Sequence, residues 1–383
     1  MPERFTNPFL AIEEKLNDFD VKKQIASEIS TSGFQRTLKT PQYSEIHTEG
    51  ETVESHYRLM FNVMSAIQHD GDEKALARLP EPVRGKLIEI EPSVRRTIKE
   101  FPATMRYLAL VHDLAKNPEG RTFKFSELRL PPKEPEKISQ MTWHMLEKFV
   151  KSELSWSSAE KTPDSPLQKD ARRLYDILLK EGLTGEQIKS LFGMNVHFLQ
   201  HEVKSADLVK GMHIPKDVKR LLVDLTWDHL RPLFNFSDEN IAYQKQRGGN
   251  TSASVINSKY REIFEGYSDE KFHLAVSLAT LDILSAVPES GKIDLNPIHR
   301  IFKARRKLWI RDKVRADYKA AVKATKSQFP ELKGVDKYQA SPEIKARINK
   351  IEEEVRLTLT QKYTQAYNQM EGIEENLEAD IEE

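Results

Sequence analysis

Apolar residues recur along this chain at intervals of three and four positions, and alternation with a period of two is scarce. Intervals of three and four place apolar side chains on one face of an α-helix, whereas period-two alternation is typical of a half-buried strand. The pattern therefore predicts an all-α protein. One clear example is the segment 51–69, where His56, Met60, Val63 and Ile67 share a stripe.

The same periodicity predicts four further helices in the first three quarters of the chain. They are expected from 102 to the doublet at 112–113, and over 194–209, 216–230 and 269–287. Proline, glycine and clustered charge lie between these segments and predict the connections.

Changes in composition divide the chain into three parts. An irregular or loosely helical lead-in is expected over 1–45, a helical domain over 46–295 and a C-terminal helical extension over 296–383. Within the domain, the segment 117–193 is rich in proline and charge, with Pro131 and Pro132 in succession. Long loops inside compact domains are uncommon and usually functional, so this segment is interpreted as an insertion beside a pocket.

The C-terminal extension contains segments of opposite charge. Residues 300–326 carry eleven Lys and Arg against two Asp, interleaved with aromatic residues. Such a run suits nucleic-acid phosphates, yet it is more often the solvated face of an amphipathic helix, and a neutral total charge favours that interpretation. A strong helix is expected from Ser341, its N-cap, with Pro342 at the first helical position. An acidic tail ends the chain.

Composition narrows the possible chemistry. The 383 residues include no cysteine, which excludes disulfides, thiolate metal sites and cysteine nucleophiles. The 59 Lys and Arg balance 59 Asp and Glu, so the chain as a whole has no attraction to nucleic acid or membranes. No stretch approaches the roughly 18 apolar residues that span a bilayer, and the first residues lack a signal peptide's apolar core. A soluble, cytoplasmic protein without membrane contact is expected.

A histidine–aspartate doublet offers the clearest chemistry. His112 and Asp113 follow an apolar run, and Lys116 comes about one helical turn later. An imidazole and a neighbouring carboxylate can bind one divalent ion, and the carboxylate can bridge to a second. A lysine nearby is suited to an anion such as phosphate. A doublet alone is weak evidence, since the chain has another at 69–70.

Five stations along the chain resemble the HD superfamily of metal-dependent phosphohydrolases. The segment 54–66 resembles the helix of the first histidine, and 111–116 resembles the doublet, with Ala115 where glycine is usual. The segments 197–202 and 226–230 resemble the two later histidine sites, and 278–286 resembles the closing aspartate. The resemblance covers about 50–290 and implies an HD-like helical bundle.

This resemblance also implies roles for particular residues. It assigns a first metal ion to His56, His112, Asp113 and Asp282, and a second ion, bridged by Asp113, to His201 and His229. Lys116 would contact phosphate oxygens. His197, one turn before His201, competes with it for the same station. Without cysteine, the ligands suit manganese, iron, magnesium or zinc. The implied reaction is hydrolysis of a phosphate ester, with nucleotides, cyclic dinucleotides and nucleic-acid ends among the family's substrates.

Two alternatives stay open from the sequence. One is a non-catalytic helical interaction module on an HD-like scaffold, favoured by Ala115 and by the long gap between the doublet and His201. The other concerns location, because the glutamate-rich C-terminus resembles the acidic tails of effectors that intracellular bacteria deliver into host cells. The sequence does not indicate an oligomeric state.

Overall fold

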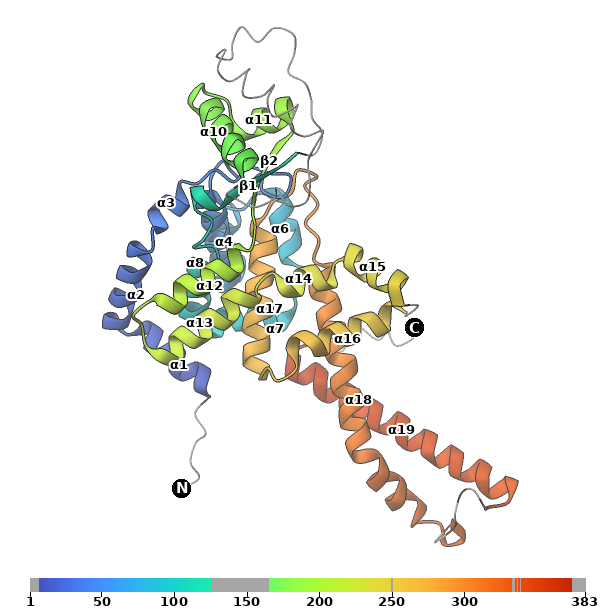
Figure 1. The fold of residues 1–383 in the computed structure, drawn as a ribbon. Coiled ribbons are helices and arrows are strands. Elements are labelled where there is room, and N and C mark those ends of the chain that lie inside the picture. Colours follow the sequence, from blue (N-terminus) through green and yellow to red (C-terminus); the bar gives the residue numbers. More distant parts are fainter. Residues whose placement is uncertain are drawn as a thin grey trace. The chain divides into compact units, whose positions relative to one another are not determined.

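The computed structural model describes most of the chain, namely residues 7–125, 165–248, 251–332, 335, 337 and 339–373. Two segments discussed above lie partly or wholly outside these residues: the middle of the insertion at 126–164 and the acidic tail from 374. Helices dominate the described residues, and they contain one two-stranded sheet (Figure 1). The all-α prediction is confirmed. None of the described helices is both long and apolar enough to cross a membrane.

Contacts divide the chain into two compact units. Unit 1 comprises 1–90, 94–233 and 267–295, and unit 2 comprises 91–93, 234–266 and 296–383. The sequence assigned 234–266 to the domain over 46–295, whereas the structure groups this segment with the C-terminal extension. The reason is that helix α16 (Ser252–Phe264) packs on the long helix α18 (Asn296–Lys326).

Unit 1 begins with three helices where an irregular or loosely helical lead-in was expected. They bury Leu16 and Ile25 completely, and the first helix packs on α8, so this segment is part of the core. The elements of unit 1 are α1 (Pro8–Asn17), α2 (Phe19–Thr31), α3 (Phe34–Leu38), α4 (Val53–Gln68), α5 (Glu73–Leu76), α6 (Glu81–Leu87), α7 (Pro92–Glu100, whose first two residues group with unit 2), α8 (Pro102–Val111), η1 (Pro118–Gly120), β1 (Arg121–Phe125), α10 (Pro166–Lys180), α11 (Gly185–Phe192), β2 (Met194–Phe198), α12 (His201–Gly211), α13 (Lys216–Asp228) and α17 (Asp269–Ser285).

Helix α8 lies at the centre of unit 1. It contacts α1, α4, α12, α13 and α17, and Met105, Leu108 and Val111 on it are completely buried. Helix α17 is buried nearly all round, as expected for a helix that is apolar on every face. A carboxylate buried on this helix, such as that of Asp282, needs a compensating cation.

The prediction of a helix over 194–209 is wrong for its first residues, 194–200. Residues 194–198 form strand β2, which pairs antiparallel with β1 so that Arg121 lies opposite Phe198, and the helix begins only at His201. Met194 and Val196 join a buried cluster with Phe123, which only a strand can supply at a spacing of two. The partner strand lies about 70 positions away along the sequence, beyond the reach of a local pattern. β1, β2, α10 and α11 lie together in Figure 1.

Unit 2 is built on two long helices. α18 packs against α19, whose start agrees with the prediction: the Ser341 side chain accepts a hydrogen bond from the backbone N–H of Ile344, and Pro342 is the first helical residue. Ile348 and Ile351 of α19 are buried in a cluster with Val322 of α18. The elements of unit 2 are α14 (Arg231–Phe236, whose first three residues group with unit 1), α15 (Asp238–Gly248), α16 (Ser252–Phe264), α18 (Asn296–Lys326), η3 (Pro330–Leu332) and α19 (Pro342–Glu371).

Candidate metal centre

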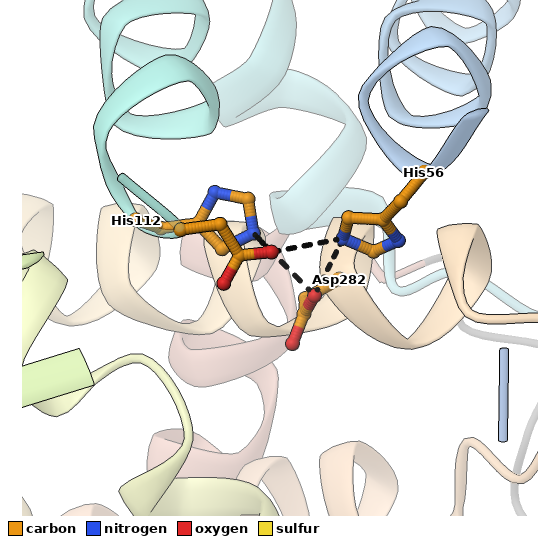
Figure 2. Close-up of side chains that lie close together, drawn as sticks. His56, His112 and Asp282 are labelled. Carbon is orange, nitrogen blue, oxygen red and sulfur yellow. Dashed lines mark ion pairs between the residues drawn. The ribbon is translucent and has the colours of Figure 1, made fainter. Parts of the chain in front are cut away.

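Three helices of unit 1 bring the first predicted ligands together. His56 lies in the first turn of α4, Asp282 lies in the last turn of α17, and His112 is the C-cap of α8. Asp113 follows in a turn closed by the bond from the Lys116 N–H to its carbonyl. Figure 2 shows the side chains of His56, His112 and Asp282 pointing toward one another from these three elements.

This first ligand group consists of His56, His112, Asp113 and Asp282, whose ligand atoms all lie within 4.8 Å of one another. The Nε2 atom of His56 lies 3.1 Å from Oδ1 of Asp282 and 3.6 Å from Oδ2 of Asp113. The Nε2 atom of His112 lies 3.2 Å from Oδ2 of Asp113 and 3.6 Å from Oδ1 of Asp282. Two imidazoles and two carboxylates thus surround one small volume.

A second ligand group shares Asp113 with the first. It consists of Asp113, His201 and His229, again with ligand atoms within 4.8 Å of one another. Oδ1 of Asp113 lies 3.1 Å from Nε2 of His201, while Oδ2 belongs to the first group. The ring of His229 lies 5.2 Å from that of His112 and 5.6 Å from that of His201. All six residues predicted to bind metal therefore converge, with Asp113 between the two groups.

Each of the four histidines presents Nε2 to the cluster, because its other ring nitrogen, Nδ1, donates a hydrogen bond to a backbone carbonyl oxygen. Nδ1 of His56 lies 3.0 Å from the carbonyl of Ser285. For the other three, the acceptor is the carbonyl three residues earlier, at 2.7–2.9 Å. The pairs are His112 with Ala109, His201 with Phe198, and His229 with Thr226. A carbonyl only accepts, so Nδ1 must carry a proton, which leaves Nε2 of the neutral ring as the metal-binding atom.

The buried polar atoms of the first group fit a metal ion. Nε2 of His56, Nε2 of His112 and Oδ1 of Asp113 are buried without a hydrogen-bond partner, and Oδ2 of Asp113 forms an ion pair with Lys116. These atoms approach one another closely but do not meet hydrogen-bond geometry, so several polar atoms converge on a common centre. Buried polar atoms in folded proteins are normally satisfied, so a cation is the missing partner that fits this donor set.

Charged neighbours shift the pKa values of the carboxylates and histidines in the cluster. Burial opposes ionisation of Asp113 and Asp282, yet the neighbouring cationic groups hold the pKa of each carboxyl well below its usual range. Burial lowers the pKa of His56, but the Asp282 and Glu49 carboxylates outweigh it and raise the pKa to about 10. Burial together with the nearby His112 lowers the pKa of His229 to about 3, so His229 is a neutral ligand.

Metal affinity should therefore rise with pH, because an ion and the Nε2 protons compete for the same atoms. With a pKa of about 10, His56 is protonated at neutral pH and must lose that proton when an ion binds. Below that pKa we expect the apparent affinity to increase about tenfold per pH unit for each displaced proton, and to level off above it. Calorimetric titration with Mn²⁺ in buffers of different protonation enthalpy counts the released protons. A count of zero at pH 7 would contradict this expectation.

Lys116 lies inside the cluster rather than at its rim. Its side chain is 6 % exposed, and Nζ lies 2.8 Å from Oδ2 of Asp113 and 6.0 Å from the ring centre of Phe198. Burial lowers the pKa of Lys116, but the Asp113 and Asp282 carboxylates outweigh this effect and raise it. The ammonium is therefore charged, and it places a fixed cation beside the shared carboxylate.

The structure separates the two competing histidines. His201 begins α12 and belongs to the second ligand group, whereas His197 lies in β2 and belongs to no ligand group among the described residues. The sequence suggested that the two histidines lie one turn apart on a helix. They do not, because β2 ends at Phe198 and α12 begins at His201.

One further group was not predicted. His47, Glu49 and His56 bring ligand atoms within 4.8 Å of one another, and His47 and Glu49 come from the loop before α4. The side chain of Glu49 is only 2 % exposed, and the neighbouring His47 and His56 rings outweigh burial to lower its pKa to about 2. The only local signal was a His–x–Glu triplet shortly before the first-histidine helix.

Comparisons of the chain with protein-family models, with curated proteins and with solved structures found no match.

Proposed function

We propose that this protein is a metal-dependent phosphohydrolase of the HD type that hydrolyses a phosphate ester of a nucleotide-like molecule. The observation that carries the proposal is that Asp113 belongs to two ligand groups at once, with one carboxylate oxygen directed to each. A bridging carboxylate between two histidine-rich groups is the arrangement expected for a pair of divalent ions. Manganese, iron, magnesium and zinc all suit imidazole and carboxylate ligands.

Divalent ions held by these residues would supply Lewis-acid chemistry, lowering the pKa of a water molecule and screening the charge of the phosphoryl group. The chain's own contribution is to hold the ligands and to exclude bulk water. The side chains of His56, His112 and Asp113 have no exposed surface, whereas those of Asp282 and His201 are 12 % and 11 % exposed. The phosphate would therefore approach from the side of Asp282 and His201.

Lys116 would provide the phosphate contact that the family resemblance implies. Its charged ammonium lies against Asp113, the residue common to both groups, so it is close to where a phosphate oxygen would be held. A lysine ammonium offers three donors and no acceptor, which suits the oxygens of an anion. The proposed role of Lys116 is substrate binding rather than metal binding.

The central test combines metal analysis with a substrate screen. Purified protein is analysed for bound transition metals, then assayed for phosphate release from nucleotides, cyclic dinucleotides and nucleic-acid ends with manganese, magnesium, iron or zinc added. We expect bound metal and metal-dependent release from at least one class. Protein that binds no metal and releases no phosphate would instead support the non-catalytic helical module.

Replacing Lys116 with glutamine should impair substrate binding while sparing the metal. A charge-assisted hydrogen bond contributes about 1.5–3 kcal/mol, so kcat/KM should fall about 10- to 100-fold, chiefly through KM. The control is Lys271→Gln, which removes another lysine paired with an aspartate, Asp224, in the same unit. Loss of bound metal in Lys116→Gln with no change in KM would refute the assigned role.

A further inference from the structure

The loop over residues 41–52, here called the strap, joins α3 to α4 and is tied to the end of α17. The backbone N–H and the hydroxyl of Thr48 both donate to the carbonyl of Val287, at 2.9 and 2.8 Å. The N–H of Glu289 donates to the carbonyl of Glu45 at 2.9 Å. The strap therefore links the helix that carries His56 to the residues that follow Asp282.

Within the strap, Glu49 makes an unusually large number of contacts for a side chain that is 2 % exposed. Its Oε1 accepts a hydrogen bond from Nε2 of Gln42 at 3.0 Å, pairs with Nδ1 of His47 at 2.9 Å and lies 3.4 Å from Nδ1 of His56. Its Oε2 accepts from the backbone N–H of Val287 at 3.2 Å. One carboxylate thus contacts the strap, α4 and the segment after α17.

We infer that Glu49 is a positioning residue for the metal centre: it holds the His56 ring so that Nε2 faces Asp282 and Asp113. The inference rests on the proposed function, since it concerns the same centre. Nδ1 of His56 has two neighbouring acceptors, the carbonyl of Ser285 at 3.0 Å and Oε1 of Glu49 at 3.4 Å. Outer carboxylates of this kind fix the tautomer and orientation of a metal-binding histidine and increase its basicity.

Glu49 also connects α4 and α17, two of the three helices that supply the first ligand group. Its Oε2 contact to Val287 lies five residues beyond Asp282, while its Oε1 lies beside His56. Loss of these contacts would leave the His56 ring held only by the carbonyl of Ser285 and the end of α17 held to the strap by Thr48 and Glu45. The contact between His56 and Asp282, now 3.1 Å, depends on both.

Only a carboxylate satisfies this set of neighbours. The N–H of Val287 on one side, and the Gln42 amide and histidine N–H groups on the other, all donate, and each needs an oxygen. A glutamine at position 49 has one oxygen and one NH₂ group, so in either orientation the NH₂ group faces a donor. Glu49→Gln therefore removes the charge and one acceptor without changing the size of the side chain.

The test compares Glu49→Gln with Glu51→Gln, a substitution in the same strap. Glu51 accepts from the N–H of Gly185 at 2.7 Å and has no contact with His56, so its loss weakens the strap but not the ring. Titration with Mn²⁺ should show a 10- to 100-fold loss of affinity in Glu49→Gln, the range typical of an outer-shell partner, and less than a twofold change in Glu51→Gln. Equal affinities in the two variants would overturn the inference.

A second measurement does not depend on metal binding. In metal-free protein labelled with ¹⁵N at histidine, the Nδ1–H signal of His56 should be protected from exchange in the wild type and in Glu51→Gln. In Glu49→Gln it should shift and exchange faster. An unchanged His56 signal would overturn the inference even if Mn²⁺ binding fell. If the wild type binds no Mn²⁺ but the His56 signal still shifts in Glu49→Gln, the proposed function is contradicted and the positioning of His56 stays supported.

Discussion

Replacing Asp113 with asparagine should remove bound metal and lower activity by more than about 100-fold, the upper range for loss of an outer-shell partner. The effect should exceed that of removing any single histidine. Asp113 contacts the first group through Oδ2 and the second through Oδ1, whereas each imidazole serves only one of these two groups. Its carboxylate is also the counter-ion of Lys116, so its loss leaves a buried ammonium without its nearest anion.

The matched control is the second histidine–aspartate doublet of the chain. Asp70 follows His69 at the end of α4, belongs to no ligand group among the described residues and pairs with Lys99. Asp70→Asn should keep metal and activity. Metal content by mass spectrometry and helical content by circular dichroism separate loss of the site from loss of the fold. A wild-type metal content in Asp113→Asn would show that the proposed site is wrong.

The wild type should bind two ions, and removing His229 should reduce this number to one. Six ligand residues exceed the three or four that one catalytic ion usually takes from protein. His229→Ala removes a ligand that only the second group uses, so His56, His112 and Asp282 should still hold an ion. We expect activity to fall about 100-fold, since two ions act together on the attacking and leaving oxygens.

His197→Ala is the control for the second ion. His197 competed with His201 as the ligand on sequence grounds, but it lies in β2 outside both groups. This variant should keep two ions, whereas His201→Ala should keep one. Competition titrations with Mn²⁺ measure the number of ions that each variant binds. One ion in the wild type, unaffected by loss of His201 or His229, would reduce the centre to the mononuclear form.

The features that sequence predicts well are those with local causes. The apolar stripe that includes His56 predicts helix 51–69, and α4 spans Val53–Gln68. The serine–proline pair at 341–342 predicts the start of α19, because a side-chain cap and a proline at the first position act within one turn. The predicted ligands are also carried by recognisable segments, which is why their convergence could be anticipated before the structure was known.

The features that sequence misses have distant causes. Strand β2 forms because Arg121–Phe125 pairs with it, and no pattern within 194–209 contains that information. Glu49 resembles any acidic loop residue until the strap brings it beside His56 and Val287. Residues 234–266 join unit 2 through packing on α18, although their composition resembles that of the preceding domain.

The pairing of β1 with β2 makes the two halves of the metal centre separable by deletion. Phe198, whose carbonyl binds Nδ1 of His201, lies opposite Arg121, and Arg121 belongs to the segment 117–193. The first ligand group, in contrast, is carried by α4, α17 and the end of α8. In a shortened chain, a brief linker would replace 117–193. Such a chain should keep the first ligand group and lose the strand pairing that positions His201 in the second group. The segment 117–193 would therefore support the second ligand group and leave the first group to the rest of unit 1.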